Sequence, residues 1–306
     1  MELVTVIIPT HNRKERVVRA IRSVLKQTYN NIEVIIVDDG STDGTENEVS
    51  KVFENEMDRI IYIRQKESKG AAVARNIGIT KSKGKYISFL DSDDEWKKNH
   101  IEKGLETINT NQLEGAFGWF DMVFNNKKKI PQEFSPFKND MSPSDYVLSR
   151  IGDPRTSTFI IEEKKLKEIM FDEKLRKHQD WDLFIRFANN FRVGTITEST
   201  VIIHIDEMDS LRMSSKKNYN LEATEYFINK HKSNTSDGPL AHFYYRVSMG
   251  LLKTGGNSNT IKNYNRKMLI KGGKSYLKKY IKLSIFNLPF INIEYISDLY
   301  RKLKYR

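Results

Sequence analysis

Four short apolar runs, separated by segments with helical spacing, fill the first 95 residues of the chain. They read LVTVIIP at residues 3–9, IEVIIVDD at 32–39, RIIYIR at 59–64 and YISFLDSDD at 86–94. Nearly continuous β-branched strands that alternate with helices are typical of a parallel sheet covered by helices on both faces. The pattern therefore predicts an α/β fold.

The pattern changes after residue 95. We expect strands at residues 116–124, 157–162 and 200–205, a polar connection with proline at 127–144, and two short helices, one ending near Met170 and one containing Trp181. From Ser214 onward the spacing predicts helices. We therefore expect a main domain over residues 1–215, with halves at about 1–95 and 96–215, followed by a helical region over 216–306.

Charge and cysteine content narrow the classes of function. The chain of 306 residues has no cysteine, which excludes disulfides, thiolate zinc sites and cysteine nucleophiles. No apolar run approaches the roughly 20 residues that span a bilayer, and the chain starts directly in a strand-like run without signal-peptide features. We therefore expect a cytoplasmic protein.

The formal net charge of +11 calls for an acidic partner. Nine basic and two acidic residues follow from Lys271 to the end, so +7 of this charge lies in the tail. Lysines beside Tyr, Ile, Leu and Phe at 276–286 are typical of a helix on an anionic membrane surface. The same pattern fits a solvated helix packed on the main domain, or an interface between copies of the chain. A basic tail without a nucleic-acid motif does not indicate a nucleic-acid partner.

Polar residues follow three of the predicted strands, at residues 10–13, 38–41 and 91–94. In parallel sheets, ligands bind beyond the carboxyl ends of the strands. The four carboxylates within residues 91–95 repel one another and call for a cation, and oxygen ligands suit Mg²⁺ or Mn²⁺. Alternatively, Asp94 caps a helix beginning at Trp96 and the other carboxylates are solvated. The segments at 38–45 and 70–76 fit a nucleotide site, but also a capped turn and a helix packed on the sheet.

Taken in order, the segments PTHNR (9–13), VDDGSTDGT (37–45), GAAVARN (70–76) and FLDSDD (89–94) closely resemble the family 2 glycosyltransferases, which have the GT-A fold. The likeness continues through FDE (171–173), HQDWDL (178–183) and His204, about two-thirds of the chain. The resemblance implies a mixed, mainly parallel sheet, with a donor half before residue 95 and an acceptor half after it. It also implies transfer of a sugar from a nucleotide-diphosphate donor, with uridine the commonest nucleotide.

The resemblance assigns roles to individual residues. Those implied to hold the nucleotide-sugar are Pro9, Thr10, Asn12, Arg13, Asp38, Asp39, Arg75, Asp91 and Ser92. Asp93 matches the metal-binding aspartate of the family's DxD element, and His204 matches a histidine near the metal or diphosphate. By itself, a histidine in an apolar strand is more often a core residue than a ligand. Arg212 and Ser214 follow where the family has further diphosphate contacts.

Asp180 matches the general base that deprotonates the acceptor hydroxyl. A single in-line displacement with one such base inverts the anomeric centre. The family commonly has glutamate where this chain has Gln179, so the surroundings of the base and the acceptor choice differ here. Asp180 also lies near a predicted helix start, where the dipole favours the ionised carboxylate; without the resemblance it reads as a helix cap.

The resulting hypothesis is an inverting glycosyltransferase that uses Mn²⁺ or Mg²⁺ and builds a bacterial surface polysaccharide, teichoic acid-like polymer or glycolipid. Its acceptor would be a glycan, a polyol phosphate or a lipid-linked molecule at the inner face of the membrane. The alternative is a non-catalytic nucleotide-sugar-binding or scaffolding protein with the same fold. Asp91, Asp93 and Asp180 argue for the enzyme, whereas Gln179 slightly favours the alternative.

Overall fold

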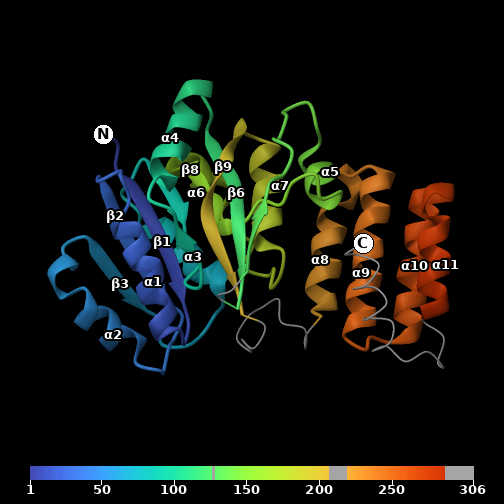
Figure 1. Ribbon diagram of the computed structural model, residues 1–306, viewed down its shortest axis with the longest axis horizontal. Coiled ribbons are helices and arrows are strands. Elements are labelled where there is room, and N and C mark those ends of the chain that lie inside the picture. Colours follow the sequence, from blue (N-terminus) through green and yellow to red (C-terminus); the bar gives the residue numbers. More distant parts are fainter. Residues whose placement is uncertain (126–127, 207–218, 287–306) are drawn as a thin grey trace. The chain divides into compact units, whose positions relative to one another are not determined.

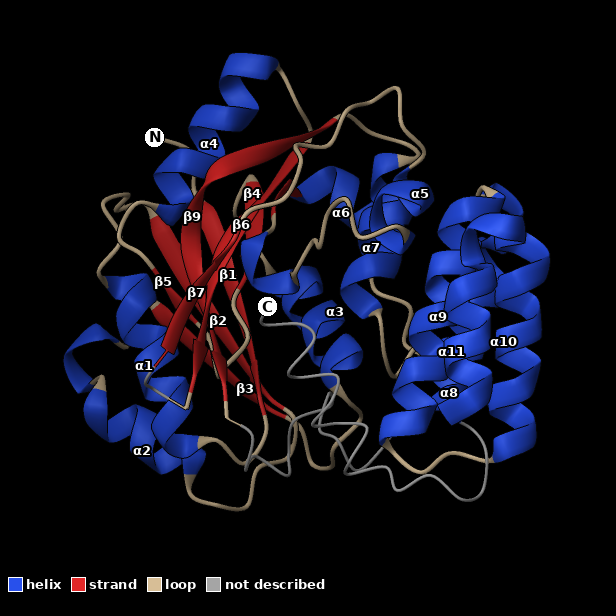
Figure 2. Cartoon of the chain, turned by 45° about the vertical axis from the view of Figure 1, so that its right-hand side comes forward, coloured by secondary structure: helices blue, strands red, loops and turns tan. Residues whose placement is uncertain are grey.

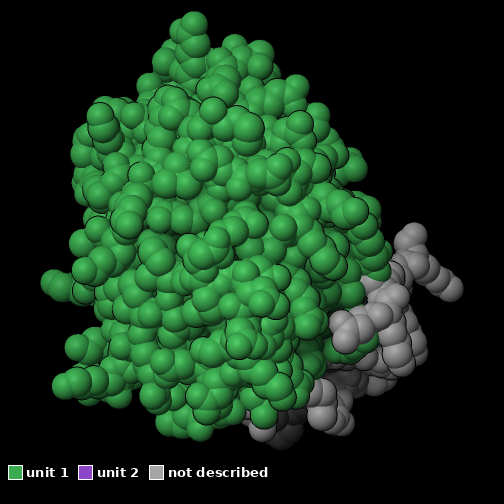
Figure 3. Space-filling model, turned by 90° about the vertical axis from the view of Figure 1, so that its left-hand side faces the viewer, with its two compact units in different colours: residues 1–143, 151–208 green, residues 144–150, 209–306 purple. Residues whose placement is uncertain are grey.

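The computed structural model describes residues 1–125, 128–206 and 219–286. Backbone contacts divide the chain into two compact units, Met1–Pro143 with Ile151–Met208 and Ser144–Arg150 with Asp209–Arg306. Figure 3 shows one face of the first unit in green. The domain boundary expected near residue 215 falls between the described ranges and stays a prediction.

The first unit contains one nine-stranded mixed sheet in the order β3-β2-β1-β4-β8-β6-β9-β5, with β7 paired to β6 (Figure 1). The strands are β1 Val4–Thr10, β2 Ile32–Asp38, β3 Ile60–Arg64, β4 Tyr86–Phe89, β5 Glu95–Trp96, β6 Gly115–Phe124, β7 Lys128–Gln132, β8 Ile160–Glu162 and β9 Val193–Ile205. Its helices are α1 Lys14–Leu25, α2 Thr45–Val52, α3 Ala71–Lys81, α4 His100–Asn111, α6 Glu163–Ile169 and α7 Gln179–Ala188. The predicted α/β class is confirmed.

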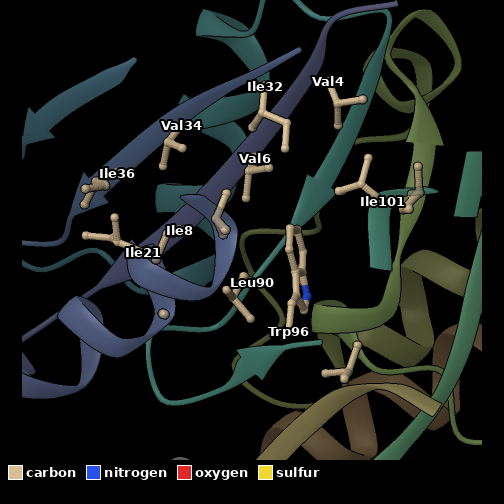
Figure 4. Close-up of a cluster of buried hydrophobic side chains, with 14 of the residues drawn as sticks. Val4, Val6, Ile8, Ile21, Ile32, Val34, Ile36, Leu90, Trp96 and Ile101 are labelled. Atoms are coloured by element: carbon tan, nitrogen blue, oxygen red, sulfur yellow. The ribbon is translucent and has the colours of Figure 1, made fainter. Parts of the chain in front are cut away.

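The four strands expected before residue 95 form the parallel half of the sheet, and helices cover both of its faces. Val34 and Ile36 of β2 pack in the same cluster as Ile21 of α1, whereas Ile35 and Val37 pack with Ala74 of α3. Figure 4 shows the α1 side of this core. On the α3 side, a Cβ added at Gly78 would lie 2.5 Å from Ile7 Cγ2, so glycine lets α3 approach β1 closely. Alternating burial thus produces the two-sided core that the apolar runs predicted.

Strand direction reverses beyond β4. The β4–β8, β8–β6 and β9–β5 pairs are antiparallel, whereas β6 and β9 are parallel to each other. The polar connection expected at 127–144 is partly wrong, because β7 forms a hairpin with β6 and α5 begins at Pro143. The strand expected at 157–162 is shorter, since residues 156–158 form a 3₁₀ turn. Figure 2 shows the resulting sheet in red.

The second unit is helical within its described residues. It contains most of α5 Pro143–Leu148, then α8 Leu221–His231, α9 Asp237–Lys253, α10 Ser258–Gly272 and α11 Leu277–Phe286. Ser144 Oγ donates to the carbonyl of Asn234 at 2.6 Å, and Asp145 Oδ1 accepts from Ser236 N at 2.8 Å, which ties α5 to the start of α9. No helix in the described parts of the chain combines the length and apolar character needed to cross a bilayer.

Candidate active site

The first two strands end in a loop pair that is held by side-chain contacts. Asn12 takes a positive φ of 51° after β1; its backbone N–H donates to Ser41 Oγ, and its Oδ1 accepts from Thr42 N, each at 2.8 Å. Pro9 and Thr10 are buried at the end of β1. Within the described residues, Thr10 Oγ1 has no hydrogen-bond partner.

Asp38 and Asp39 are both buried and already hydrogen-bonded. Asp38 accepts from Ser41 N at 2.8 Å and from the Tyr62 hydroxyl at 2.7 Å. Asp39 accepts from four donors, Gln65 Nε2, Ser68 Oγ, Lys69 N and Gly70 N, at 2.7–2.8 Å. Charge-assisted bonds of this kind are among the strongest in proteins. Asp39 therefore positions the loop over residues 65–70, whereas Asp38 holds the turn at Ser41 and the Tyr62 hydroxyl. The predicted contact of both carboxylates with the nucleotide stays a prediction.

Three carboxylates meet just beyond the end of β4. Asp91, Asp93 and Asp94 each offer an oxygen, and these oxygens lie within 4.8 Å of one another. Arg13 pairs with Asp93 at 3.0 Å, and Arg75 pairs with Asp91 at 2.6 Å. Burial at low dielectric makes such a cluster of like charges costly without cations.

The donor set of this cluster fits Mn²⁺ or Mg²⁺. Both ions prefer carboxylate oxygens and bind to few protein ligands when substrate phosphates complete the coordination. Asp93 and Asp91 keep partly exposed side chains, 15% and 34% respectively, whereas Asp94 is buried and accepts from Ser157 Oγ at 2.6 Å. Ser92 is also buried. The alternative in which Asp94 caps a helix beginning at Trp96 is wrong, because that stretch is strand β5 and α4 begins at His100.

Arg75 joins this cluster to the helix that carries Asp180. It is buried in α3, and while one amino nitrogen contacts Asp91, the other donates to Gln179 Oε1 at 2.8 Å. Its guanidinium also lies over the ring of Phe171, 5.2 Å from the centroid. Arg75 therefore connects Gln179, the residue before the predicted base, to Asp91 in the predicted donor site.

Asp180 lies in the first turn of α7 with 19% of its side chain exposed. Burial raises its pKa to about 6; Arg155, with a nitrogen 3.8 Å from Asp180 Oδ2, opposes the rise, as does the bond from Trp181 N, whereas Asp153 and Asp91 add to it. The expectation that the helix dipole keeps this carboxylate at a low pKa is therefore wrong. Desolvation outweighs it, and the carboxyl titrates in the range suited to a general base near neutral pH.

The segment over residues 153–157 reaches both parts of the site, although no motif in the sequence marks it as functional. Asp153 accepts from Arg155 Nε at 3.1 Å and from Trp181 Nε1 at 3.0 Å. Ser157 Oγ accepts from Asp91 N at 3.1 Å and donates to Asp94. The run of polar residues at 155–158, at the start of the predicted strand, was the available signal.

His204 lies on β9, with its Nε2 3.4 Å from Glu95 Oε2. Its pKa is lowered, mainly by burial and then by the charge of Arg19. The possible metal-binding group among the described residues consists of Asp91, Asp93 and Asp94 and does not include His204. The predicted role of His204 at the metal or diphosphate therefore stays a prediction. Arg212 and Ser214 lie outside the described residues.

Comparison with known proteins gives consistent results. The family model described as glycosyl transferase family 2 matches residues 5–170. An uncharacterized glycosyltransferase of Rickettsia felis is 32% identical over 226 residues, which is 74% of this chain and 35% of that protein. The amylovoran biosynthesis glycosyltransferase AmsB of Erwinia amylovora is 33% identical over 193 residues, 60% of this chain and 62% of that one. This chain thus spans less than two thirds of these relatives.

Among solved structures, TarS residues 1–349 of S. aureus in complex with UDP-GlcNAc matches with a TM-score of 0.66. The match is 19% identical and covers 98% of this chain and 92% of that one. At this identity the likeness concerns the fold, and it confirms the predicted GT-A fold. With the family model matching more than half of its length, the chain belongs to glycosyl transferase family 2.

Proposed function

We propose that the chain is an inverting, metal-dependent glycosyltransferase that transfers a hexosyl or N-acetylhexosaminyl group from a UDP-sugar. The acceptor would be a hydroxyl of a glycan, a polyol phosphate or a lipid-linked molecule in bacterial surface polymer synthesis. The TarS structure holds UDP-GlcNAc, and AmsB is named for amylovoran biosynthesis, which supports the donor class and the pathway class. The observation that carries the proposal is the bridge of Arg75 between Asp91 and the residue preceding Asp180.

Asp93 would bind Mn²⁺ or Mg²⁺ beyond the end of β4, and Asp91, in the same carboxylate cluster, would hold the nucleotide. The ion, when bound, supplies charge stabilisation for the leaving diphosphate. Arg13 and Arg75 lie against these carboxylates at 3.0 and 2.6 Å, which supports a role for both cations beside the diphosphate. The hydrogen bond from Gly70 N to Asp39 would hold the backbone just before α3 in a position to contact the nucleotide.

Asp180 would remove the proton from the acceptor hydroxyl. A carboxyl with a pKa of about 6 is largely ionised at pH 7 and binds a proton more strongly than an ordinary aspartate does. Arg155, which Asp153 holds through two hydrogen bonds, limits how far that pKa rises. Because the acceptor hydroxyl would attack the sugar directly, without a covalent intermediate on the protein, a single displacement would invert the anomeric centre. We place this activity on the cytoplasmic side of the cell membrane.

Calorimetric binding of UDP, with and without Mn²⁺, tests the donor site. We expect binding that requires Mn²⁺ in the wild type and is lost in Asp93→Asn. Asp58→Asn serves as the matched control, because Asp58 is an exposed aspartate before β3, away from the carboxylate cluster. UDP binding that is unchanged both without Mn²⁺ and in Asp93→Asn would contradict a metal site at Asp93. Failure of UDP, GDP and dTDP to bind at all would favour the non-catalytic scaffolding protein.

Incubation with UDP-GlcNAc and UDP-glucose then tests the reaction. We expect slow release of UDP with water as acceptor, and its loss in Asp180→Asn while UDP binding persists. Release of UDP at the wild-type rate in Asp180→Asn would contradict the role of this residue as the base.

A further inference from the structure

The end of the described chain is uniformly basic. Residues 258–286, which form α10, the 3₁₀ turn Gly273–Tyr276 and α11, contain no acidic residue. The eight basic residues are Lys262, Arg266, Lys267, Lys271, Lys274, Lys278, Lys279 and Lys282. Such a density of positive charge attracts an anionic surface within a Debye length.

The buried side of these helices is well defined. Ile261, Tyr264 and Met268 of α10 are buried, and Tyr264 donates its hydroxyl to Glu225 at 2.6 Å. Leu283 of α11 is 1% exposed. Of the two interpretations of residues 276–286, an interfacial helix and a packed helix, Leu283 follows the packed one, because its side chain is buried.

Two large apolar side chains remain in water among the lysines. Ile270, near the end of α10, is 70% exposed, and Leu277, at the start of α11, is 45% exposed. They lie seven residues apart along the chain, on either side of Lys271 and Lys274, which are exposed as well. We name Ile270, Lys271, Lys274, Leu277 and Lys278 the basic–apolar turn.

Two basic residues outside the basic–apolar turn contact aromatic rings of the second unit. Lys267 lies 4.7 Å from the centroid of the Tyr264 ring, and Lys279 lies 4.5 Å from that of Tyr276. Lys271 pairs with Asp237 at 2.8 Å, but both groups are exposed, so this pair is weak and readily exchanged. Lys274 and Lys278 are exposed.

We propose that the basic–apolar turn docks the chain on an anionic phospholipid bilayer, with Ile270 and Leu277 inserted among the headgroups. Lysines meet the lipid phosphates, and the two apolar side chains leave water, a combination typical of interfacial segments. A nucleic acid would be met by the lysines alone and would leave both apolar side chains in water. This membrane-docking role is separate from the proposed transfer reaction, and its test needs no nucleotide sugar.

Sedimentation of the full chain with vesicles tests the proposal. We expect binding to vesicles of phosphatidylcholine with phosphatidylglycerol, little binding to phosphatidylcholine alone, and weakening with salt. Lys274→Gln/Lys278→Gln is expected to lower the affinity about 30-fold, since each lysine near an anionic surface contributes about a fivefold factor. Ile270→Ser/Leu277→Ser is expected to lower it at least tenfold, by roughly the burial free energy of two partly inserted side chains.

Matched variants in the first unit are the controls. Met57→Ser/Ile61→Ser removes two exposed apolar side chains, and Lys51→Gln/Lys83→Gln removes two exposed lysines; both should bind like the wild type. Equal binding to both vesicle types, no binding, or indifference to the Ile270 and Leu277 substitutions would overturn the proposal. Binding of single-stranded RNA that depends on the lysines but not on the apolar pair, with no vesicle binding, would identify a nucleic acid instead. Circular dichroism melting confirms that each variant is folded.

Discussion

Replacing Asp180 by asparagine is expected to stabilise the folded chain at pH 8 while abolishing sugar transfer. The folded protein raises the pKa of this carboxyl from 3.8 to about 6, mainly by removing it from water. The fold therefore favours the protonated form, so ionisation lowers the stability once the pH exceeds the unfolded pKa, and the full cost is reached above the folded pKa. Asparagine has no charge to desolvate, so the variant escapes this cost at every pH.

The magnitude follows from the two pKa values. The cost is absent below pH 3.8, grows between pH 3.8 and 6, and is constant above that range. It amounts to about 3 kcal/mol at pH 8 and about half of that at pH 5. For a unit of this size, about 3 kcal/mol corresponds to a rise in Tm of roughly 6–12 °C.

Thermal unfolding of the wild type and of Asp180→Asn at pH 8 and pH 5 measures both values. Asp182→Asn, two residues further along the same helix, is the matched control. Asp182 is fully buried and pairs with Arg186 at 2.7 Å, so its loss should lower the Tm by leaving a charge without its carboxylate. A lower Tm for Asp180→Asn at pH 8, or a gain that is the same at both pH values, would refute the reasoning.

Three further outcomes follow from contacts in the first unit. Arg155→Met should raise the pKa of Asp180 and shift the acidic limb of the transfer rate to higher pH, whereas Arg155→Lys should keep it; an unmoved limb in a pH–rate profile would contradict this. Gly78→Ala should cost about 1–3 kcal/mol in urea unfolding, because its Cβ meets Ile7, and Ile7→Val should recover part of the loss; a neutral Gly78→Ala would count against this close approach. Asp39→Ala should expose the loop over residues 65–70 to limited proteolysis; unchanged protection of that loop would show that Asp39 does not hold it.

The parallel half of the sheet was predictable because every strand there is apolar on both faces. Ile35 and Ile36 are both buried although they point to opposite sides of the sheet. Such a strand can be recognised from its apolar run alone, without deciding which of its faces is buried. β7 was missed because most of its residues are polar and, among the described strands, it pairs with β6 alone. Its pairing depends on a hairpin that the composition does not reveal.

The site was predictable where charges are adjacent along the chain, as at Asp91 and Asp93. It was not predictable where the partners come from distant segments. The pKa of Asp180 depends on burial and on Arg155, and neither is visible in the sequence around residue 180. Likewise, Asp38 and Asp39 look like free ligands in the sequence, and only the fold brings Tyr62 and Gly70 to them.

The guanidinium of Arg75 is shared between Asp91 and Gln179, and this sharing has an evolutionary consequence. Positions 75, 91 and 179 cannot drift independently, because a change of charge at one alters how the buried cation is neutralised by the other two. With glutamine at 179, Asp91 is the carboxylate that pairs with Arg75 in this contact. Among relatives, the acid or amide at the position before the base should therefore covary with the residues around Arg75, and a change of acceptor would be inherited as a set of linked substitutions.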